Sequence, residues 1–496
     1  MSLRLFVFSV LLVLVPLAAS DTSLDRFLKC LPSHSDPSYP VSRAIYGITN
    51  SSFEPTLRAY AKASRFLTSS TPKPLAIIAA MHESHVQATV ICAKSNGLQI
   101  RVPFIILDTF NLRSIDIDVA GKTAWIQSGA TTGELYYNIA NKSNVLAFPA
   151  GVCLTLGAGG HFSGGGYGPL MRKHGLSIDN IVDAKIVDVN GKILDRKSMG
   201  EDLFWAIRIN LVDVPPKVTA FTVSKTLEQG ATDVVYRWQE VASKLDKELF
   251  IRVMPGVVNG SSGSNKTVRV SFIGLFLGPS CKLLPLMKNS FPELGLQQKD
   301  CNEMSWVEST LYWFGLPNGT SIETLLNRPT RASFFKRKSD YVQRAIPKKG
   351  LEKIWQTMIK VERVWMQWNP YGGRMDEIPA TATAFPHRAG NLFKIQYSVD
   401  WSDQEGIEAA NHHIDLITQL YDTMTPYVSS NPREAFLNYR DVDIGSNPSN
   451  QTSFEKAKVY GRKLFKNNFI RLVKVKSRVD PGDFFKYEQS IPASLK

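Results

Sequence analysis

The stretch 150-AGVCLTLGAGGHFSGGGYG-168 carries most of the fold information in this 496-residue chain. It packs eight glycines, one cysteine and one histidine into nineteen residues. Glycine lets backbone N–H groups approach a ligand closely and adopt positive φ, so such a loop can form a nest for a phosphate group. The alternative is a glycine-rich surface loop without a ligand, and the thiol of Cys153 beside the glycines makes that alternative weaker.

Two familiar nucleotide loops are excluded by the spacing of these glycines. The pattern G-x-G-x-x-G would need glycine at Phe162 if it began at Gly157, and at Pro169 if it began at Gly164. No Gly-Lys-Ser or Gly-Lys-Thr follows, which excludes a Walker loop. A dinucleotide held by another backbone geometry remains open.

Length and composition indicate a folded protein of more than one part. A chain of 496 residues is too long for one simple core, and 44% hydrophobic with 10% aromatic residues excludes disorder as the main state. The formal net charge is +14, and such an excess predicts either an acidic partner, for instance a wall polysaccharide such as pectin, or a generally basic surface. We expect no nucleic-acid partner and no metal site.

The first twenty residues predict a secretory signal. Arg4 precedes the apolar run 5–18, and Ala18-Ala19-Ser20 offers a cleavage site. A membrane anchor is the alternative, but the run is shorter than the ~20 residues that a spanning helix needs, and it contains Pro16. We therefore expect a secreted, cell-wall protein, glycosylated at six sequons: Asn50, Asn141, Asn259, Asn265, Asn318 and Asn450.

Hydrophobic periodicity divides the rest of the chain into three blocks of an α+β fold. Short strands and helices alternate over 72–216, as in the strand LAIIAA (75–80) and the helix-like segment 83–97. Longer strands follow over 217–430, with helical patterns at 352–368 and 406–424. The tail 431–496 returns to mixed loops.

Two strand patterns carry polar side chains that could do chemistry. In NLFKIQYSVDW (391–401), Lys394 and Gln396 alternate with apolar residues and so share one face. Arg252 projects opposite to its two apolar neighbours in LFIRVMP, and Tyr167 and Tyr439 add two phenols. A solvated strand face with structural tyrosines is the alternative explanation for these patterns.

Long motifs spread along the chain resemble one family, the plant berberine-bridge-enzyme-like flavoproteins. The resemblance extends from about Phe27 to Ile491 and is carried by FPAGVC, GGHFSGGGYG, MRKHGLSIDNIVDAKIVDVNGKILDRKSMGEDLFWAIR, EMSWVES, NPYGGRM, FPHRAGNLFKIQYSVDW, LNYRDVDIG and EQSIP. It implies a vanillyl-alcohol-oxidase (PCMH-type) fold with a two-part FAD-binding domain and a substrate domain containing an antiparallel sheet. The implied division is 1–20 signal, 21–71 N-terminal segment, 72–216 FAD-binding domain, 217–430 substrate domain and 431–496 C-terminal segment completing the FAD-binding domain.

The resemblance also implies roles for individual residues. FAD would be attached through Cys153 and held by Leu156, Gly157, Gly159, Gly160, His161, Gly164, Gly165 and Gly166. Cys30 and Cys92 match the family's disulfide. Tyr439 would remove a proton from a substrate alcohol while hydride passes to FAD, because a nearby cation such as Lys394 favours an ionised phenol. Tyr167, Arg252 and Gln396 would complete the site, and Leu156 resembles the dehydrogenase type.

The chain departs from the family pattern at two glycine-rich segments. LQIR (98–101) runs directly into VPFIILD, and FWAIR (204–208) directly into INLVDVPPKV, so phosphate-binding loops at 101/102 and 208/209 are missing. The family's histidine anchor has no counterpart, which leaves Cys153 as the single expected attachment. Smaller departures are Leu154 in place of proline and Asp483 in place of asparagine.

These observations predict a monomeric, FAD-dependent oxidoreductase. Its substrate would be an alcohol group of a carbohydrate or of a monolignol-like phenolic compound. The alternative is a flavin-free, non-catalytic extracellular glycoprotein, or a degenerate or mis-spliced member of the family.

Overall fold

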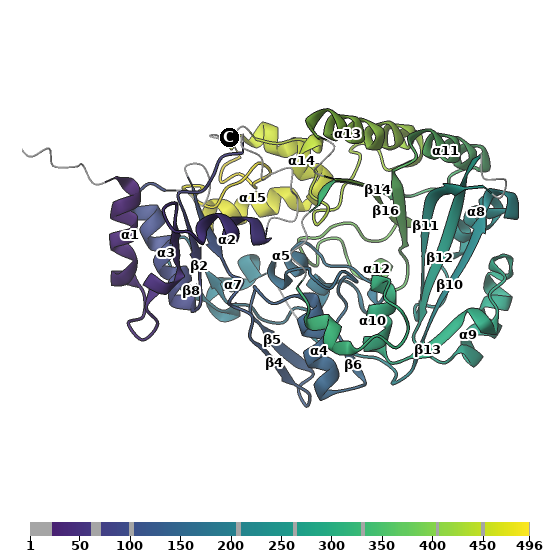
Figure 1. Ribbon diagram of the computed structural model, residues 1–496, viewed down its shortest axis with the longest axis horizontal. Helices are drawn as coiled ribbons and strands as arrows, with labels where there is room; N and C mark the ends of the chain where they lie inside the picture. Colours follow the sequence, from purple (N-terminus) through teal and green to yellow (C-terminus); the bar gives the residue numbers. More distant parts are fainter. Residues whose placement is uncertain are drawn as a thin grey trace, which may run out of the picture.

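The computed structural model describes residues 22–60, 71–98, 104–204, 210–260, 265–328, 333–402, 406–447 and 452–495. Helices and strands are mixed, and one large antiparallel sheet stands beside several small ones (Figure 1). The α+β prediction is therefore confirmed. The signal sequence, Asn450 and both predicted breaks, at 101/102 and 208/209, lie outside the described residues.

The N-terminal part is a small sheet covered by two helices. A capping box of Thr22 and Asp25 begins α1, and the Cys30–Cys92 disulfide ties α1 to α3, as the resemblance predicted. Strand β2 pairs antiparallel with β1 and parallel with β3. The elements are α1 (Ser23–His34), β1 (Ile45–Gly47), α2 (Phe53–Tyr60), β2 (Ala76–Ala79), α3 (Glu83–Ser95) and β3 (Ile105–Asp108).

The segment that follows holds the glycine-rich stretch between short strands and helices. Each of its two-stranded sheets is antiparallel: β4 with β5, β6 with β9 and β7 with β8. The elements are β4 (Ile115–Asp118), β5 (Thr123–Ile126), α4 (Thr132–Lys142), β6 (Leu146–Ala147), α5 (Ala158–Ser163), α6 (Met171–His174), β7 (Ile186–Val187), β8 (Ile193–Leu194), α7 (Arg196–Phe204) and β9 (Val212–Asp213).

A seven-stranded antiparallel sheet forms the second half, in the order β13-β10-β12-β11-β15-β16-β14. Four helices, α8, α9, α11 and α13, cover one face, where Trp238 and Trp355 pack with Trp368 of the sheet. The strands are β10 (Val218–Thr226), β11 (Leu249–Asn259), β12 (Lys266–Phe276), β13 (Cys301–Met304), β14 (Phe334–Val342), β15 (Trp365–Pro370) and β16 (Phe393–Trp401). The helices are α8 (Ala231–Val241), α9 (Ser280–Ser290), α11 (Lys348–Val361) and α13 (Gly406–Thr423).

The other face of this sheet packs against the glycine-rich half. Phe250, Leu275 and Tyr341 of the sheet share one core with Tyr136 of α4 and with Tyr167. Two short helices, α10 (Trp306–Phe314) and α12 (Arg374–Glu377), lie along this contact (Figure 1). Side chains on this face therefore meet the residues around Cys153.

One secondary-structure prediction was wrong in its second half. The helical pattern expected over 352–368 ends at Val361, where Glu362 takes a positive φ of 47°, and Trp365–Pro370 is the interior strand β15. The buried positions change spacing at this point, from the helical Trp355 and Met358 to the alternating Met366 and Trp368. A period of two is the signature of a strand.

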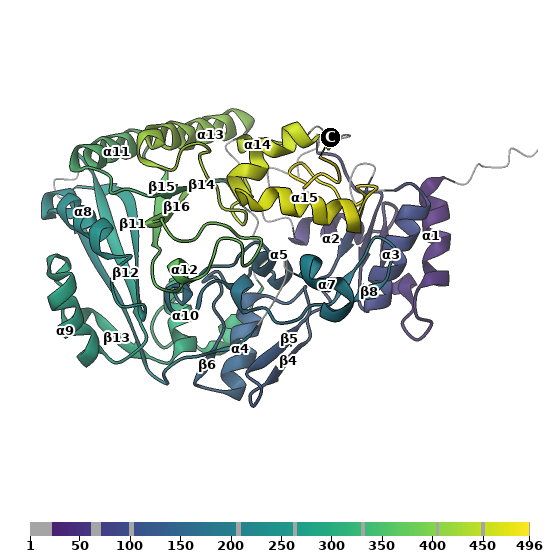
Figure 2. The ribbon, with the colours of Figure 1, turned by 180° about the vertical axis from the view of Figure 1, so that it is seen from behind.

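The last helices bring the chain back to its beginning. Helices α14 (Phe454–Phe465) and α15 (Asn468–Val479) pack together, and α15 contacts α7 of the first half (Figure 2). Further on, Phe484 packs against the core of α1 and α3. In the part of the chain described above, no helix is long and apolar enough to cross a membrane.

Candidate active site

Close packing within the protein explains several glycines of the opening stretch. A Cβ at Gly164 would lie 2.3 Å from Nδ2 of Asn438, and one at Gly166, where φ is 66°, would lie 2.3 Å from Oγ of Ser177. Asn438 also accepts from the Gly166 N–H and donates to the Gly160 carbonyl. The stretch is thus pinned to the loop that carries Tyr439.

At two other positions of the stretch, packing within the protein does not require glycine. A Cβ at Gly157 or Gly160 would meet no atom within 4 Å, and neither residue has a positive φ. Both are exposed, as are Gly159 and the free thiol of Cys153. Because glycine at these positions is needed neither for packing nor for backbone conformation, the close approach of a ligand remains as its physical reason. An open thiol beside such a cradle fits a covalently attached FAD.

His161 lies on the buried side of this cradle, in α5. Its Nε2 accepts a hydrogen bond of 2.9 Å from the Gly151 N–H, which requires an unprotonated nitrogen. Burial, with a smaller contribution from the positive charge of Lys394, lowers the pKa of His161 to about 3. His161 is therefore a neutral part of the loop structure. Leu156 and His161 both lie against Gly151, where an added Cβ would be 2.8 Å from Leu156 Cδ1 and 3.0 Å from His161 Nε2.

The histidines nearest in sequence to the missing anchor motif are engaged elsewhere. His82 caps α3 and stacks on the Tyr39 ring, and His85 Nε2 lies 2.7 Å from the Tyr39 carbonyl oxygen. Their hydrogen bonds give both histidines a structural role in the N-terminal part.

Three of the five predicted catalytic residues form one buried cluster. The hydroxyls of Tyr167 and Tyr439 are hydrogen bonded to each other. Lys394 Nζ lies 3.2 Å from the centroid of the Tyr167 ring, 3.5 Å from that of Phe436 and 4.9 Å from that of Tyr439. The Lys394 side chain is 1% exposed, so the interpretation of this strand face as solvated is wrong.

Arg252 and Gln396 lie on the same face of the sheet, and each is fixed by a residue that the sequence analysis missed. Arg252 Nε donates to Asn369 Oδ1 at 2.7 Å, and Gln367 Nε2 donates to Gln396 Oε1 at 3.0 Å. Register pairs Lys394 with Asn369 and Gln396 with Gln367. The alternation in WMQWNP (365–370) was the available signal, but it was assigned to a helix.

The charges of this cluster are unusual because its side chains are largely buried. Burial raises the pKa of Tyr439 well above 10, and the neighbouring Tyr167 raises it further. Burial also lowers the pKa of Lys394 well below its ordinary value, and Arg252 acts in the same direction. Among the described residues, the Lys394 ammonium group contacts the rings of Tyr167, Phe436 and Tyr439. Both shifts favour the uncharged forms of the phenol and of the amine.

A buried ion-pair network holds the segment that carries Tyr439. Lys336 Nζ lies 2.5 Å from an Asp441 oxygen and 2.7 Å from Asp443, and Lys338 reaches the same two carboxylates at 3.0 and 2.7 Å. The Asp441 side chain is 3% exposed and that of Asp443 is 44% exposed. Since Asp441 is two residues beyond Tyr439, strand β14 determines where this phenol lies.

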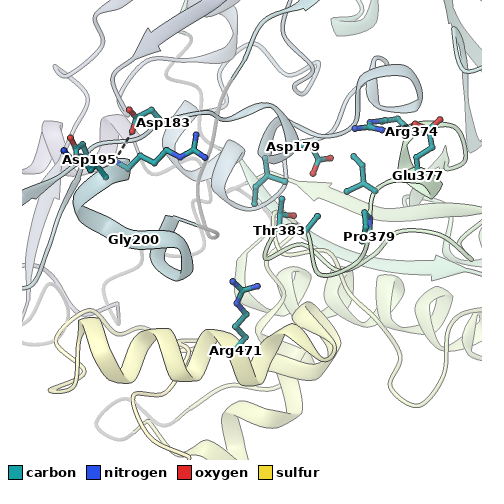
Figure 3. Close-up of a pocket in the computed structure, with 14 residues that line it drawn as sticks. Asp179, Asp183, Asp195, Gly200, Arg374, Glu377, Pro379, Thr383 and Arg471 are labelled. Carbon is teal, nitrogen blue, oxygen red and sulfur yellow. Dashed lines mark hydrogen bonds and ion pairs between the residues drawn. The ribbon is translucent and has the colours of Figure 1, made fainter.

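A cavity of about 930 Å³ lies on another side of the glycine-rich half. Figure 3 shows Asp183, Asp195 and Gly200 on one side, Arg374 on another and Arg471 projecting from α15. The cavity adjoins the glycine-rich stretch, because Ile178, which lines the cavity, donates its N–H to the Gly165 carbonyl. The lining holds four basic and four acidic residues and none of the predicted site residues. Its charges are balanced, which favours no particular ligand.

The described asparagines of the predicted glycosylation sites lie on the surface of the protein. Five of the sequon asparagines are described, and each is exposed: Asn50, Asn141, Asn259, Asn265 and Asn318. Cys281 and Cys301 are free thiols like Cys153, so no second disulfide joins them. Glycosylation itself stays a prediction.

Two family models match separate parts of the chain, one in its first half and one near its C-terminus. Residues 68–196 match the FAD-binding domain, and residues 435–492 match the segment described as berberine and berberine like. The solved structure of a BBE-like protein of Arabidopsis thaliana is 41% identical, with a TM-score of 0.88 over 95% of this chain and all of that one. A grass pollen allergen with glucose dehydrogenase activity, Phl p 4, has the same TM-score at 38% identity over the same shares. Fold and site thus define an FAD-linked oxidoreductase.

The curated relatives make the assignment more specific. Berberine bridge enzyme-like 17 of Arabidopsis thaliana is 53% identical over 97% of this chain and 98% of its own length. Berberine bridge enzyme-like 4 of the same plant is also 53% identical, over 96% of both chains. The chain belongs to the berberine bridge enzyme-like family, as the sequence motifs predicted.

We predict that His161 makes the protein sensitive to acid. Its folded pKa of about 3 lies below the ordinary 6.5, so the unfolded chain binds a proton that the folded chain excludes as pH falls below 6.5. The histidine should therefore remove about 2 kcal/mol of stability between pH 7 and pH 5. Urea unfolding of wild type and His161→Gln at both pH values measures this. An equal loss in both proteins would contradict the assignment.

We also predict unequal roles for Asp441 and Asp443. Asp441→Asn removes a carboxylate that contacts two buried lysines and should cost about 3 kcal/mol of unfolding free energy. Asp443→Asn is the matched control; it contacts the same lysines from a half-exposed position and should cost under about 1 kcal/mol. Urea unfolding at pH 7 compares them, and equal costs would show that burial does not decide the effect.

Proposed function

We propose that this protein is a secreted oxidoreductase that oxidises an alcohol group of a carbohydrate or of a monolignol-like phenolic compound, using FAD attached through Cys153. The observation that carries the proposal is the buried Lys394–Tyr167–Tyr439 cluster beside the open cradle. The two are in contact through Phe436: a Cβ on Gly165 would lie 3.3 Å from its ring, and Lys394 Nζ lies 3.5 Å from the centroid of the same ring.

Cys153 and the exposed glycines would hold the cofactor. The Cys153 Sγ would form a thioether with the flavin, while Gly157, Gly159 and Gly160 would leave room for close backbone approach. FAD supplies a two-electron acceptor for a hydride from the substrate carbon. The neutral His161 would keep the loop in shape from behind.

The tyrosine pair would take the proton of the substrate hydroxyl. Tyr439 would receive it as the tyrosinate and become a neutral phenol; before that step, Tyr167 would stabilise the negative charge of the tyrosinate by donating the hydrogen bond between the two hydroxyls. Lys394, 3.2 Å from the Tyr167 ring centroid, stabilises a tyrosinate more than a neutral phenol. Because strongly coupled groups titrate as a unit, the pair and the lysine together act as the base.

Arg252 and Gln396 would orient the substrate. Asn369 fixes the guanidinium of Arg252, whose carbon also lies 5.0 Å from the Trp313 ring centroid, and Gln367 fixes the amide of Gln396. A dry face with a few prearranged polar groups is the usual construction of a small-molecule site. A carbohydrate substrate is supported by Phl p 4, which is named as a glucose dehydrogenase. Leu156 supports a dehydrogenase rather than an oxidase.

The flavin-free glycoprotein is the second candidate, and the two missing glycine-rich segments favour it. With both segments absent, FAD binding rests on the Cys153 stretch alone. The colour of the purified protein distinguishes the candidates: flavin absorbance near 450 nm supports the oxidoreductase, and its absence supports the glycoprotein.

We predict that Cys153→Ala abolishes covalent attachment. Acid precipitation should leave the flavin in the pellet for wild type and release it into the supernatant for the variant. Cys281→Ala and Cys301→Ala are matched controls that should keep it in the pellet. Burial raises the pKa of Cys301 to about 11, and the carboxylates of Asp300 and Glu303 add to this, so it forms little reactive thiolate. Flavin retained by Cys153→Ala would refute the anchor.

We predict that Tyr439→Phe lowers the rate of flavin bleaching by substrate roughly 10²- to 10⁴-fold, the usual contribution of a general base, without loss of bound flavin. Lys394→Met should slow the reaction as well, because the tyrosinate loses its cation. Tyr236→Phe, on the outer helix α8, is the control and should react like wild type. Anaerobic mixing with D-glucose and with coniferyl alcohol measures the rates. An unchanged rate in Tyr439→Phe would exclude it as the base.

A further inference from the structure

More than half of the protein's net charge is concentrated in its last two helices. Residues 454–479, which form α14 and α15, hold nine Lys or Arg side chains and one Glu, a net charge of +8. The rest of the chain contributes +6 to the total of +14. A local excess of this size creates a positive potential that a general basic surface does not.

The apolar sides of these helices are already used. Tyr460 and Leu464 of α14 pack with Phe469 and Val473 of α15 in one buried core. Figures 1 and 2 both show the two helices side by side, with α14 near the upper edge of the molecule and α15 below it, toward α2. Their polar sides therefore face solvent in a fixed orientation, with Val459 of α14 and Ile470 of α15 as single exposed apolar side chains among them.

Six of the nine basic side chains form two contrasting groups. Lys458, Lys466 and Lys476 are paired with Glu455, Glu434 and Asp480 respectively. In contrast, no carboxylate of the described residues lies within ion-pair distance of Lys456, Arg462 or Lys474, and all three are exposed. We call these three exposed cations of α14 and α15 together the C-terminal basic surface.

We propose that the C-terminal basic surface docks a polyuronate chain, an acidic polysaccharide whose sugar rings carry carboxylates. Lys456 and Arg462 are six residues apart on one helix, a rise of about 9 Å and a turn of about 240°, so they project from different flanks of its exposed side, and Lys474 adds a third cation from the neighbouring helix. Cations fixed at such intervals suit an extended polymer with repeated negative charges better than a single small anion. The surface lies outside the oxidation site and would hold the protein in an acidic matrix.

The choice of partner follows from charge and compartment. A polyuronate is the polyanion expected for a chain with a signal-like N-terminus and six sequons, since nucleic acid is not expected there. An anionic membrane would attract the same cations, but the apolar side chains that α14 and α15 expose, Val459 and Ile470, are single residues rather than the apolar face of an interfacial helix. Lipid binding is therefore an outcome that the test must distinguish.

The test compares two triple variants of the full-length protein with equal loss of charge. Lys456→Gln/Arg462→Gln/Lys474→Gln neutralises the C-terminal basic surface. Lys349→Gln/Lys353→Gln/Lys360→Gln neutralises three exposed lysines of α11 and is the matched control. Calorimetric titration with polygalacturonate in 50 mM NaCl should show at least tenfold weaker binding for the first variant and under twofold for the control. Raising the salt concentration should weaken wild-type binding, because salt screens the charges.

Three results would overturn the proposal. Equal weakening in both variants would mean that only the net charge matters. Equal binding of wild type to fully methyl-esterified pectin would mean that the carboxylates are not recognised. Tighter binding to vesicles of phosphatidylcholine and phosphatidylserine than to polygalacturonate, lost in the first variant, would assign the surface to a membrane. Flavin content and thermal stability of both variants, expected to equal those of wild type, keep a folding defect or a failed oxidation site apart from a failed docking surface.

Discussion

A lysine buried among aromatic rings is the constraint on which the active site depends. Lys394 is held by the faces of Tyr167, Phe436 and Tyr439, which come from distant parts of the chain. A cation in a dry site is costly unless electron-rich groups surround it, so these rings must meet at one point. The same charge helps to keep His161 neutral behind the cradle. Strand β16, the glycine-rich stretch and the loop of Tyr439 are thus coupled through one ammonium group.

The glycines of the opening stretch serve two separate purposes. Gly164 and Gly166 allow neighbouring side chains to approach the backbone, and any larger residue would displace Asn438 or Ser177. Gly157 and Gly160 border open space and exclude nothing within the protein. The first pair is explained by folding and the second by a ligand. The stretch is therefore both a structural joint and a cradle, although the chain lacks the loops that accompany it in the family.

Much of the fold and site could be predicted from the sequence because the signals were local or carried by long motifs. Alternation in NLFKIQYSVDW placed Lys394 and Gln396 on one face correctly, and the family motifs gave the fold class and the Cys30–Cys92 bridge. Burial of that face could not be predicted, because it depends on a second half of the molecule that covers it. Asn369 and Gln367 were missed because the apolar pattern of helix α11 runs on into that of strand β15 without a break in the sequence. The positive φ of Glu362, at which the helix ends, cannot be read from that pattern.

The contact of Phe484 with the first core relates the order of synthesis to the order of folding. This ring comes twelve residues before the end of the chain, yet it packs with a core whose other members lie between α1 and β3. At about 5–20 residues per second, roughly 20 to 80 s separate the synthesis of Cys92 from that of Phe484. During this interval the early core lacks one of its apolar rings. The Cys30–Cys92 bridge can close before then and keep the nascent N-terminal part together until the tail arrives.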